Sequence, residues 1–170
     1  MELEENAVLK ELQNIFLSDN EENIHDAISY IHENCSMKMV PLLFDLLRSN
    51  KNKTIQNDVF NCLMDAKDAQ AVPLFIDALH DEQLKNEKKH LLSTIWQANL
   101  DFSQHIDVFM EILLHDSYEN ALEAFTIIEV CAEKLSDEEK IRCKTAISNA
   151  MLNEHSEKQA LLQATAEILQ

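Results

Sequence analysis

A recurring apolar stripe constrains the fold of this chain more than any other feature. In its central copy, apolar residues stand at relative positions 0, 3, 4 and 7, as Val72, Phe75, Ile76 and Leu79. These positions share one face of a helix with 3.6 residues per turn. The same spacing begins at Val40, Ile106 and Cys143, giving intervals of 32, 34 and 37 residues. We predict four related helices here and call them second-type helices.

A second apolar pattern lies between these helices, with residues at relative positions 0, 1 and 4. It recurs at intervals of 32, 32, 33 and 36 residues, beginning at Ala27, Val59, Leu91, Ala124 and Ala160. We call the helices that carry it first-type helices. A two-helix unit of this size cannot bury its apolar face alone, so neighbouring units must stack. The predicted fold class is therefore an all-α solenoid of about ten helices in about five antiparallel hairpins.

The central stretch also carries a resemblance to a known family. Residues 71–81 read A-V-P-L-F-I-D-A-L-H-D, which resembles the second helix of HEAT repeats of the short phycobilisome-lyase type. The likeness is partial over residues 40–49 and only a pattern elsewhere. It implies a right-handed α-α superhelix of the HEAT or armadillo kind.

We predict one repeat domain over residues 1–170, because no linker or low-complexity segment divides the chain. The predicted parts are an N-terminal cap helix at 1–18, repeats at about 20–50, 52–82, 84–116 and 117–153, and a C-terminal cap helix at 155–170. Capping-box patterns mark three helix starts: Asp101-x-x-Gln104, Ser136-x-x-Glu139 and Ser156-x-x-Gln159.

Composition excludes several classes of function. Glycine is absent, whereas phosphate-binding loops, dinucleotide fingerprints and nucleophile elbows all require it. The formal charge of −17 disfavours nucleic acid as a partner. No apolar run approaches the roughly 18 residues of a membrane span, and the first residues are acidic where a signal peptide is basic. We therefore expect no membrane partner and a cytoplasmic location.

The candidate partner-binding residues lie at relative positions 1, 5 and 8 of the second-type helices, the positions that packing leaves uncovered. In the HEAT resemblance this face lines the inside of the curve, where partners usually bind. The candidates are Asp45, Arg48, Asp77, His80, Asp107 and Glu111. The predicted function is a non-catalytic scaffold that presents an acidic concave surface to a protein or peptide, for which a basic partner fits the charge. A solvated face without a ligand is the alternative, and the oligomeric state stays open.

Two other classes of function remain open: an enzyme or accessory subunit of the lyase or metal-dependent type, and a self-associating structural protein. HEAT-type deoxyhypusine hydroxylases carry His-Glu pairs at the start of their first helices, and His25-Asp26 occupies that place once. Glu22-x-x-His25 and Glu87-x-x-His90 imitate the Glu-x-x-His motif of di-iron bundles. Because a two-metal site needs several converging ligands, we predict no metal, cofactor or catalytic residue.

Structural roles are predicted for the other residues with reactive or aromatic side chains. Histidine followed by aspartate closes two helices, where the pair suits capping. The four cysteines form no C-x-x-C pair, so we expect buried thiols, and we expect the single tryptophan to pack between repeats. These residues are His80, Asp81, His115, Asp116, Cys35, Cys62, Cys131, Cys143 and Trp96.

Overall fold

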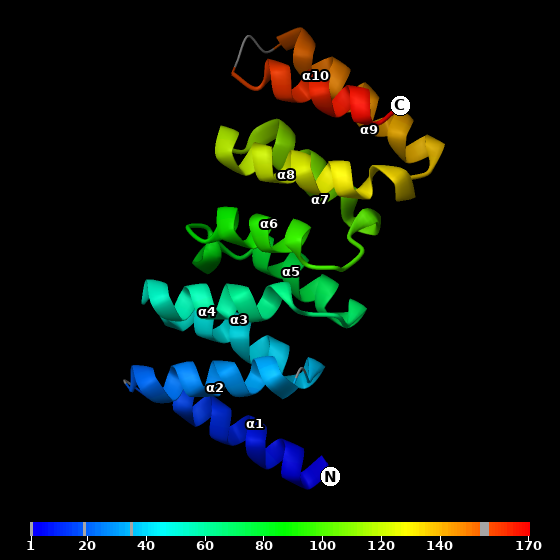
Figure 1. The fold of residues 1–170 in the computed structure, drawn as a ribbon. Helices are drawn as coiled ribbons and strands as arrows, with labels where there is room; N and C mark the ends of the chain where they lie inside the picture. The colour runs from blue at the N-terminus through cyan, green and yellow to red at the C-terminus, as the bar shows by residue number, and fades with distance from the viewer. Residues whose placement is uncertain (1, 19, 35, 154–156) are drawn as a thin grey trace. The chain divides into compact units, whose positions relative to one another are not determined.

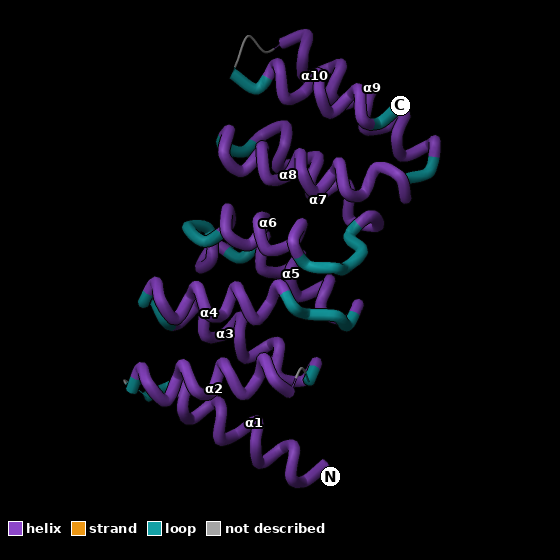
Figure 2. The backbone as a smooth tube through the Cα atoms, in the orientation of Figure 1, coloured by secondary structure: helices purple, strands orange, loops and turns teal. Residues whose placement is uncertain are grey.

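Helices are the only regular secondary structure in the described part of the chain. The structure is a computed structural model that describes residues 2–18, 20–34, 36–153 and 157–170. Within these ranges there are ten α-helices, five short 3₁₀-helices and no strand (Figure 2). The prediction of an all-α fold with about ten helices is confirmed. The right-handed superhelix and the single repeat domain stay predictions.

The ten α-helices follow one another through short connections (Figure 1). Their bounds are α1 Glu2–Phe16, α2 Glu21–Asn34, α3 Val40–Ser49, α4 Lys53–Met64, α5 Val72–Leu79, α6 Lys88–Gln97, α7 Ile106–His115, α8 Tyr118–Cys131, α9 Asp137–Asn153 and α10 Gln159–Ile168. The even-numbered helices are the predicted first-type helices, and α3, α5, α7 and α9 are the second-type helices. The 3₁₀-helices are Met37–Met39, Ala69–Ala71, Glu82–Leu84, Ser103–His105 and Ala132–Lys134.

Burial follows both predicted patterns. All four stripe residues of α5 and of α7 are buried, as are all three pattern residues of α2, α4 and α6. The pattern weakens in the last helices, where Ala146 is half-buried and Ala160 is exposed. It is also weak in α1, where Leu12 is buried but Val8 and Ile15 are only half-buried. The spacing of apolar residues therefore identifies the covered side of the inner helices.

Side chains cap several helices where the sequence predicts it. Ser136 and Glu139 form the expected capping box, because Ser136 Oγ accepts from Glu139 N at 3.3 Å and Glu139 Oε2 accepts from Ser136 N at 2.8 Å. Asp101 instead accepts from the backbone N–H of Ser103 at 3.0 Å, and the N-cap residue of the 3₁₀-helix that begins at Ser103 is Phe102. The third predicted box begins at Ser156, which lies outside the described residues.

The chain divides into two compact units, one formed by residues 1–86 and 97–100 and the other by residues 87–96 and 101–170. In the first unit, α4 packs against both α2 and α3, and α1 packs against α2. Phe44 of α3 and Phe75 of α5 meet edge to face, with ring centroids 5.3 Å apart. Both rings are buried, so this aromatic pair lies in the core of the first unit.

In the second unit, α7 packs against α8, and α10 packs against α8 and α9. Phe102 and Phe109 form its edge-to-face aromatic pair, with centroids 6.2 Å apart. The buried ammonium of Lys158 donates to the carbonyl oxygens of Leu113 and Leu114 at 3.4 and 3.3 Å. These carbonyls belong to the last turn of α7, where intrahelical donors run out. Lys158 therefore caps α7 from a distant part of the sequence.

A membrane span needs about 20 predominantly apolar residues in one helix. Among the described residues, no helix meets that requirement.

Candidate functional site

Four predicted site residues lie in the first unit, on two second-type helices. Asp45 and Arg48 belong to α3, Asp77 belongs to α5, and His80 is the C-cap residue of α5. The side chains of Asp45, Asp77 and His80 are exposed, whereas Arg48 is half-buried. The prediction that these positions remain uncovered is thus met by the two aspartates and the histidine.

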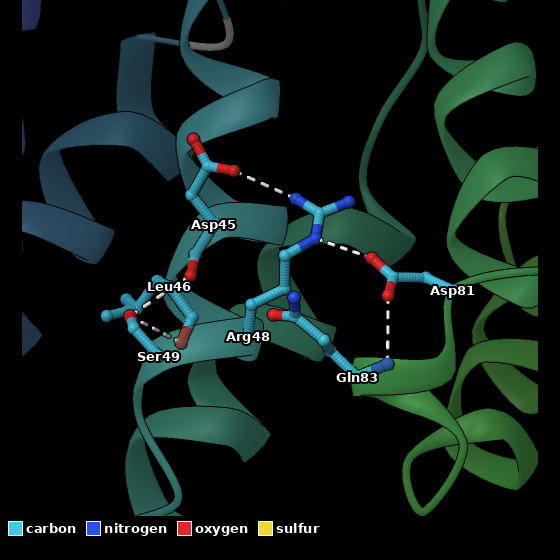
Figure 3. A network of polar contacts seen from close by, with 6 residues as sticks. All are labelled: Asp45, Leu46, Arg48, Ser49, Asp81 and Gln83. Carbon is cyan, nitrogen blue, oxygen red and sulfur yellow. Dashed lines mark hydrogen bonds and ion pairs between the residues drawn. The ribbon is translucent and has the colours of Figure 1, made fainter.

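Arg48 is the centre of a polar network that the sequence pattern did not identify (Figure 3). Its Nε donates to Asp81 Oδ2 at 2.7 Å, and its Nη1 donates to Asp45 Oδ1 at 2.8 Å. The other Asp81 oxygen accepts from the backbone N–H of Gln83 at 2.9 Å. Arg48 was predicted as one of the partner-binding residues. Its charge is instead shared by two carboxylates, so the face around it keeps a net negative charge.

Acid is expected to weaken the first unit through Asp81. Hydrogen bonds from Arg48, and then from Gln83, hold the pKa of the Asp81 carboxyl below its usual value. The contribution of this group is therefore complete above the pKa of the unfolded chain, about 3.9, and is lost as the pH falls through the folded-state value. We expect Asp81→Asn to flatten the fall in thermal midpoint between about pH 5 and pH 3, measured by circular dichroism. Asp77→Asn is the matched control, and equal slopes for wild type and Asp81→Asn would contradict the assignment.

His80 serves the backbone of its own helix. Its Nδ1 lies 2.8 Å from the carbonyl oxygen of Ile76, and because a carbonyl only accepts, Nδ1 must carry the proton. The following Asp81 caps Glu82–Leu84 by accepting from Gln83 N. The predicted capping role of the His80–Asp81 pair is confirmed. Because Nδ1 donates to Ile76, Nε2 is the imidazole nitrogen of His80 through which it could contact a ligand.

The other two predicted site residues, Asp107 and Glu111, lie on α7 in the second unit, and both are exposed. Asp107 Oδ1 accepts from Arg142 of α9 at 2.8 Å, and Glu111 lies 3.8 Å from His115. A shallow hollow of about 410 Å³ includes Glu111 and His115 in its lining. That Glu111 continues the surface of Asp45 and Asp77 stays a prediction.

His25, which was considered for a metal site, pairs with an aspartate, and so does His32 of the same helix. His25 Nδ1 lies 2.5 Å from Asp58 Oδ2, and His32 Nε2 lies 2.6 Å from Asp65 Oδ2. Both pairs join α2 to α4 or to its C-cap residue. Among the described residues, no group of three or more His, Cys, Asp or Glu side chains is arranged to hold a metal ion. In the two Glu-x-x-His motifs, Glu87 is buried, His25 is half-buried, and Glu22 and His90 are exposed.

Several of the polar links in the first unit share one register, which sequence reasoning missed, whereas Glu5–Ser36 and Glu21–Asn52 join residues 31 apart. Four polar pairs in the first unit each join residues 33 positions apart: Glu5–Lys38, His25–Asp58, His32–Asp65 and Arg48–Asp81. This separation is one residue longer than the 32-residue interval of the apolar patterns there. In each pair, the second residue therefore stands one position after the residue that is equivalent to the first one in the apolar pattern. A search for complementary side chains at this separation would have found them.

The cysteines have the expected structural character. Cys62, Cys131 and Cys143 are buried thiols outside any disulfide, and Cys35 lies outside the described residues. Burial, and then the charge of Asp101, raise the pKa of Cys131 to about 11. A thiol with this pKa is protonated at neutral pH and is a poor nucleophile.

Trp96 differs from the expectation of a packed aromatic. Its side chain is 38% exposed, and its indole N–H donates to Glu123 Oε2 at 2.8 Å. We expected packing because Trp96 stands beside Ile95 on a first-type helix. The polar partner on α8 instead keeps the ring near the surface, as is common for an indole with one polar atom.

Comparisons with known proteins give no relative: no family model, curated protein or solved structure is significantly similar to this chain.

Proposed function

We propose that this chain is a non-catalytic, HEAT-like scaffold of the cytoplasm that holds a basic segment of a protein or peptide. The observation that carries the proposal is the pair of exposed carboxylates, Asp45 and Asp77, at the same position of two successive second-type helices. The network around Arg48 supports it, because the guanidinium of Arg48 is already shared by Asp45 and Asp81 (Figure 3). With 31 acidic and 14 basic residues in the chain, this surface favours a cationic ligand.

The spacing of these helices suits an extended ligand. Packed helices have axes about 8–10 Å apart, and an extended chain in the polyproline II conformation rises about 3.1 Å per residue with three residues per turn. A Lys or Arg at every third residue of a peptide therefore matches one carboxylate per second-type helix. Surface ion pairs are individually weak, on the order of 0.2–1 kcal/mol, so the proposed ligand uses several of them.

A charge-reversal experiment tests the proposal. The probe is a fluorescently labelled peptide that is extended in solution and has Lys at every third position. Its affinity is measured by fluorescence anisotropy at low and moderate salt. Asp45→Lys/Asp77→Lys should weaken binding by about tenfold or more, since two attractions become two repulsions. Binding to the wild-type chain should weaken with salt.

The matched control is Glu119→Lys/Glu129→Lys, which makes the same change in net charge at exposed positions of α8. It should weaken binding much less than the change at Asp45 and Asp77. Equal weakening would mean that only net charge matters, and absence of binding to wild type would also overturn the proposal. Thermal midpoints of both variants show whether the fold is retained.

A further inference from the structure

A groove between α1 and α2 is lined by both apolar and acidic side chains. Its volume is about 420 Å³, and its lining consists of Val8, Glu11, Leu12, Ile15, Asn23, Asp26, Ala27 and Tyr30. Val8 and Ile15 are half-buried in this lining, whereas Glu11 and Asp26 supply carboxylates and are exposed. Tyr30 is 41% exposed. The groove thus combines incompletely covered apolar side chains with negative charge.

The same face of the next first-type helix is covered. A shift of 32 residues places Asn23, Ala27 and Tyr30 of α2 on Ile55, Val59 and Cys62 of α4. These three residues of α4 are buried, and α4 packs against α2. This face of a first-type helix is therefore one that accepts a neighbouring helix in this fold.

Carboxylates on this face of α4 accept hydrogen bonds from the helix that covers it. Asp58 and Asp65 pair with His25 and His32 of α2, which are seven residues apart. Shifting the two aspartates by 32 residues gives Asp26 and Glu33 of α2, and both side chains are exposed. The acidic positions of a helix contact are thus repeated on α2 at its open face.

The second unit contains an independent example. Glu123 of α8 stands directly before Ala124, as Asp58 stands before Val59 and Asp26 before Ala27. Its Oε2 accepts from the indole N–H of Trp96, on the first-type helix α6. An acidic residue at this position therefore contacts a donor on a preceding first-type helix in both units.

We propose that the groove between α1 and α2 binds an amphipathic helix of a partner protein. Its apolar side would cover Val8, Ile15 and Tyr30, and two basic residues seven positions apart would face Asp26 and Glu33. A length of about four turns matches α2, which has 14 residues. Recognition by an apolar stripe flanked by charges is the usual mode for a helix in a groove.

Charge favours a foreign helix over a second copy of this chain. Acidic residues outnumber basic ones by 31 to 14, so a second copy brings mostly like charge to Asp26 and Glu33. The proposal concerns a different surface from that of Asp45 and Asp77 and does not depend on it.

A charge-swap experiment tests the proposal with designed helical probes. One peptide has a leucine stripe and two lysines seven positions apart, a second has glutamates in place of the lysines, and a third has serines in place of the leucines. The wild-type chain should bind the lysine peptide about tenfold more tightly than either of the others. Asp26→Lys/Glu33→Lys should reverse the preference between the lysine and glutamate peptides.

Controls locate the interaction and separate it from the acidic surface. Glu119→Lys/Glu129→Lys and Asp45→Lys/Asp77→Lys should leave the lysine peptide preferred, and bound peptide should slow amide hydrogen exchange in α1 and α2. An unchanged preference in Asp26→Lys/Glu33→Lys would overturn the proposal. So would concentration-dependent self-association of the wild type that the same variant abolishes, because a second copy would then occupy the groove.

Discussion

Replacing Phe75 by alanine is expected to lower the free energy of unfolding by about 3–5 kcal/mol, the usual range for a buried phenyl ring. Phe75 is fully buried at the central copy of the apolar stripe. Its ring packs edge to face on Phe44 at an interplanar angle of 89°. The substitution removes this aromatic contact and leaves a cavity that a close-packed core fills only in part.

Urea denaturation followed by far-ultraviolet circular dichroism measures the effect of Phe75→Ala. Leu17→Ala is the control in the same unit, because Leu17 is 81% exposed, and its change should stay within about 0.5 kcal/mol. A loss below about 1 kcal/mol for Phe75→Ala would mean that the stripe does not mark the core.

Lys158→Ala is expected to destabilise the second unit by about 2–3 kcal/mol, near the upper end for single substitutions. Lys158 is 7% exposed, so the change removes buried methylenes as well as the ammonium. The carbonyl oxygens of Leu113 and Leu114 lose the donor that caps the last turn of α7. Hydrogen bonds from a charged donor contribute about 1.5–3 kcal/mol, and relief of ammonium burial offsets part of this loss.

Lys158→Met separates the two parts of that effect. Methionine retains most of the apolar stem but cannot cap α7, so its loss should be smaller than that of alanine. Thermal denaturation measures both variants, and amide exchange at the end of α7 reports the cap directly. If both variants were as stable as wild type, the contact from Lys158 to α7 would have no energetic role.

The two apolar patterns were sufficient to predict the inner helices, α2 to α7, and their covered sides. Helix periodicity is a local property, and a side chain at relative position 0, 3, 4 or 7 shares a face whatever the neighbouring helix is. Phe75 and Phe109, predicted from one stripe, are both fully buried. The box of Ser136 and Glu139 was readable for the same reason, because its two partners are three residues apart.

Contacts between helices could not be predicted in the same way. The partners of Arg48 and His25 depend on how far one helix is displaced along the next, and an apolar pattern does not specify this displacement. In the first unit four polar links join residues 33 apart, whereas the stripes repeat at 32. The six predicted site residues came from a position on each helix alone, so their ion pairs were missed.

By itself, the sequence determined the class of fold, the sides of the helices that are buried and the acidic character of the surface, because local periodicity and charge are properties of the chain. Only the tertiary structure decided that Arg48 joins two aspartates and that α2 keeps an open face beside α1. These features depend on the relative displacement of packed helices, which results from the fit of side chains that are distant in sequence.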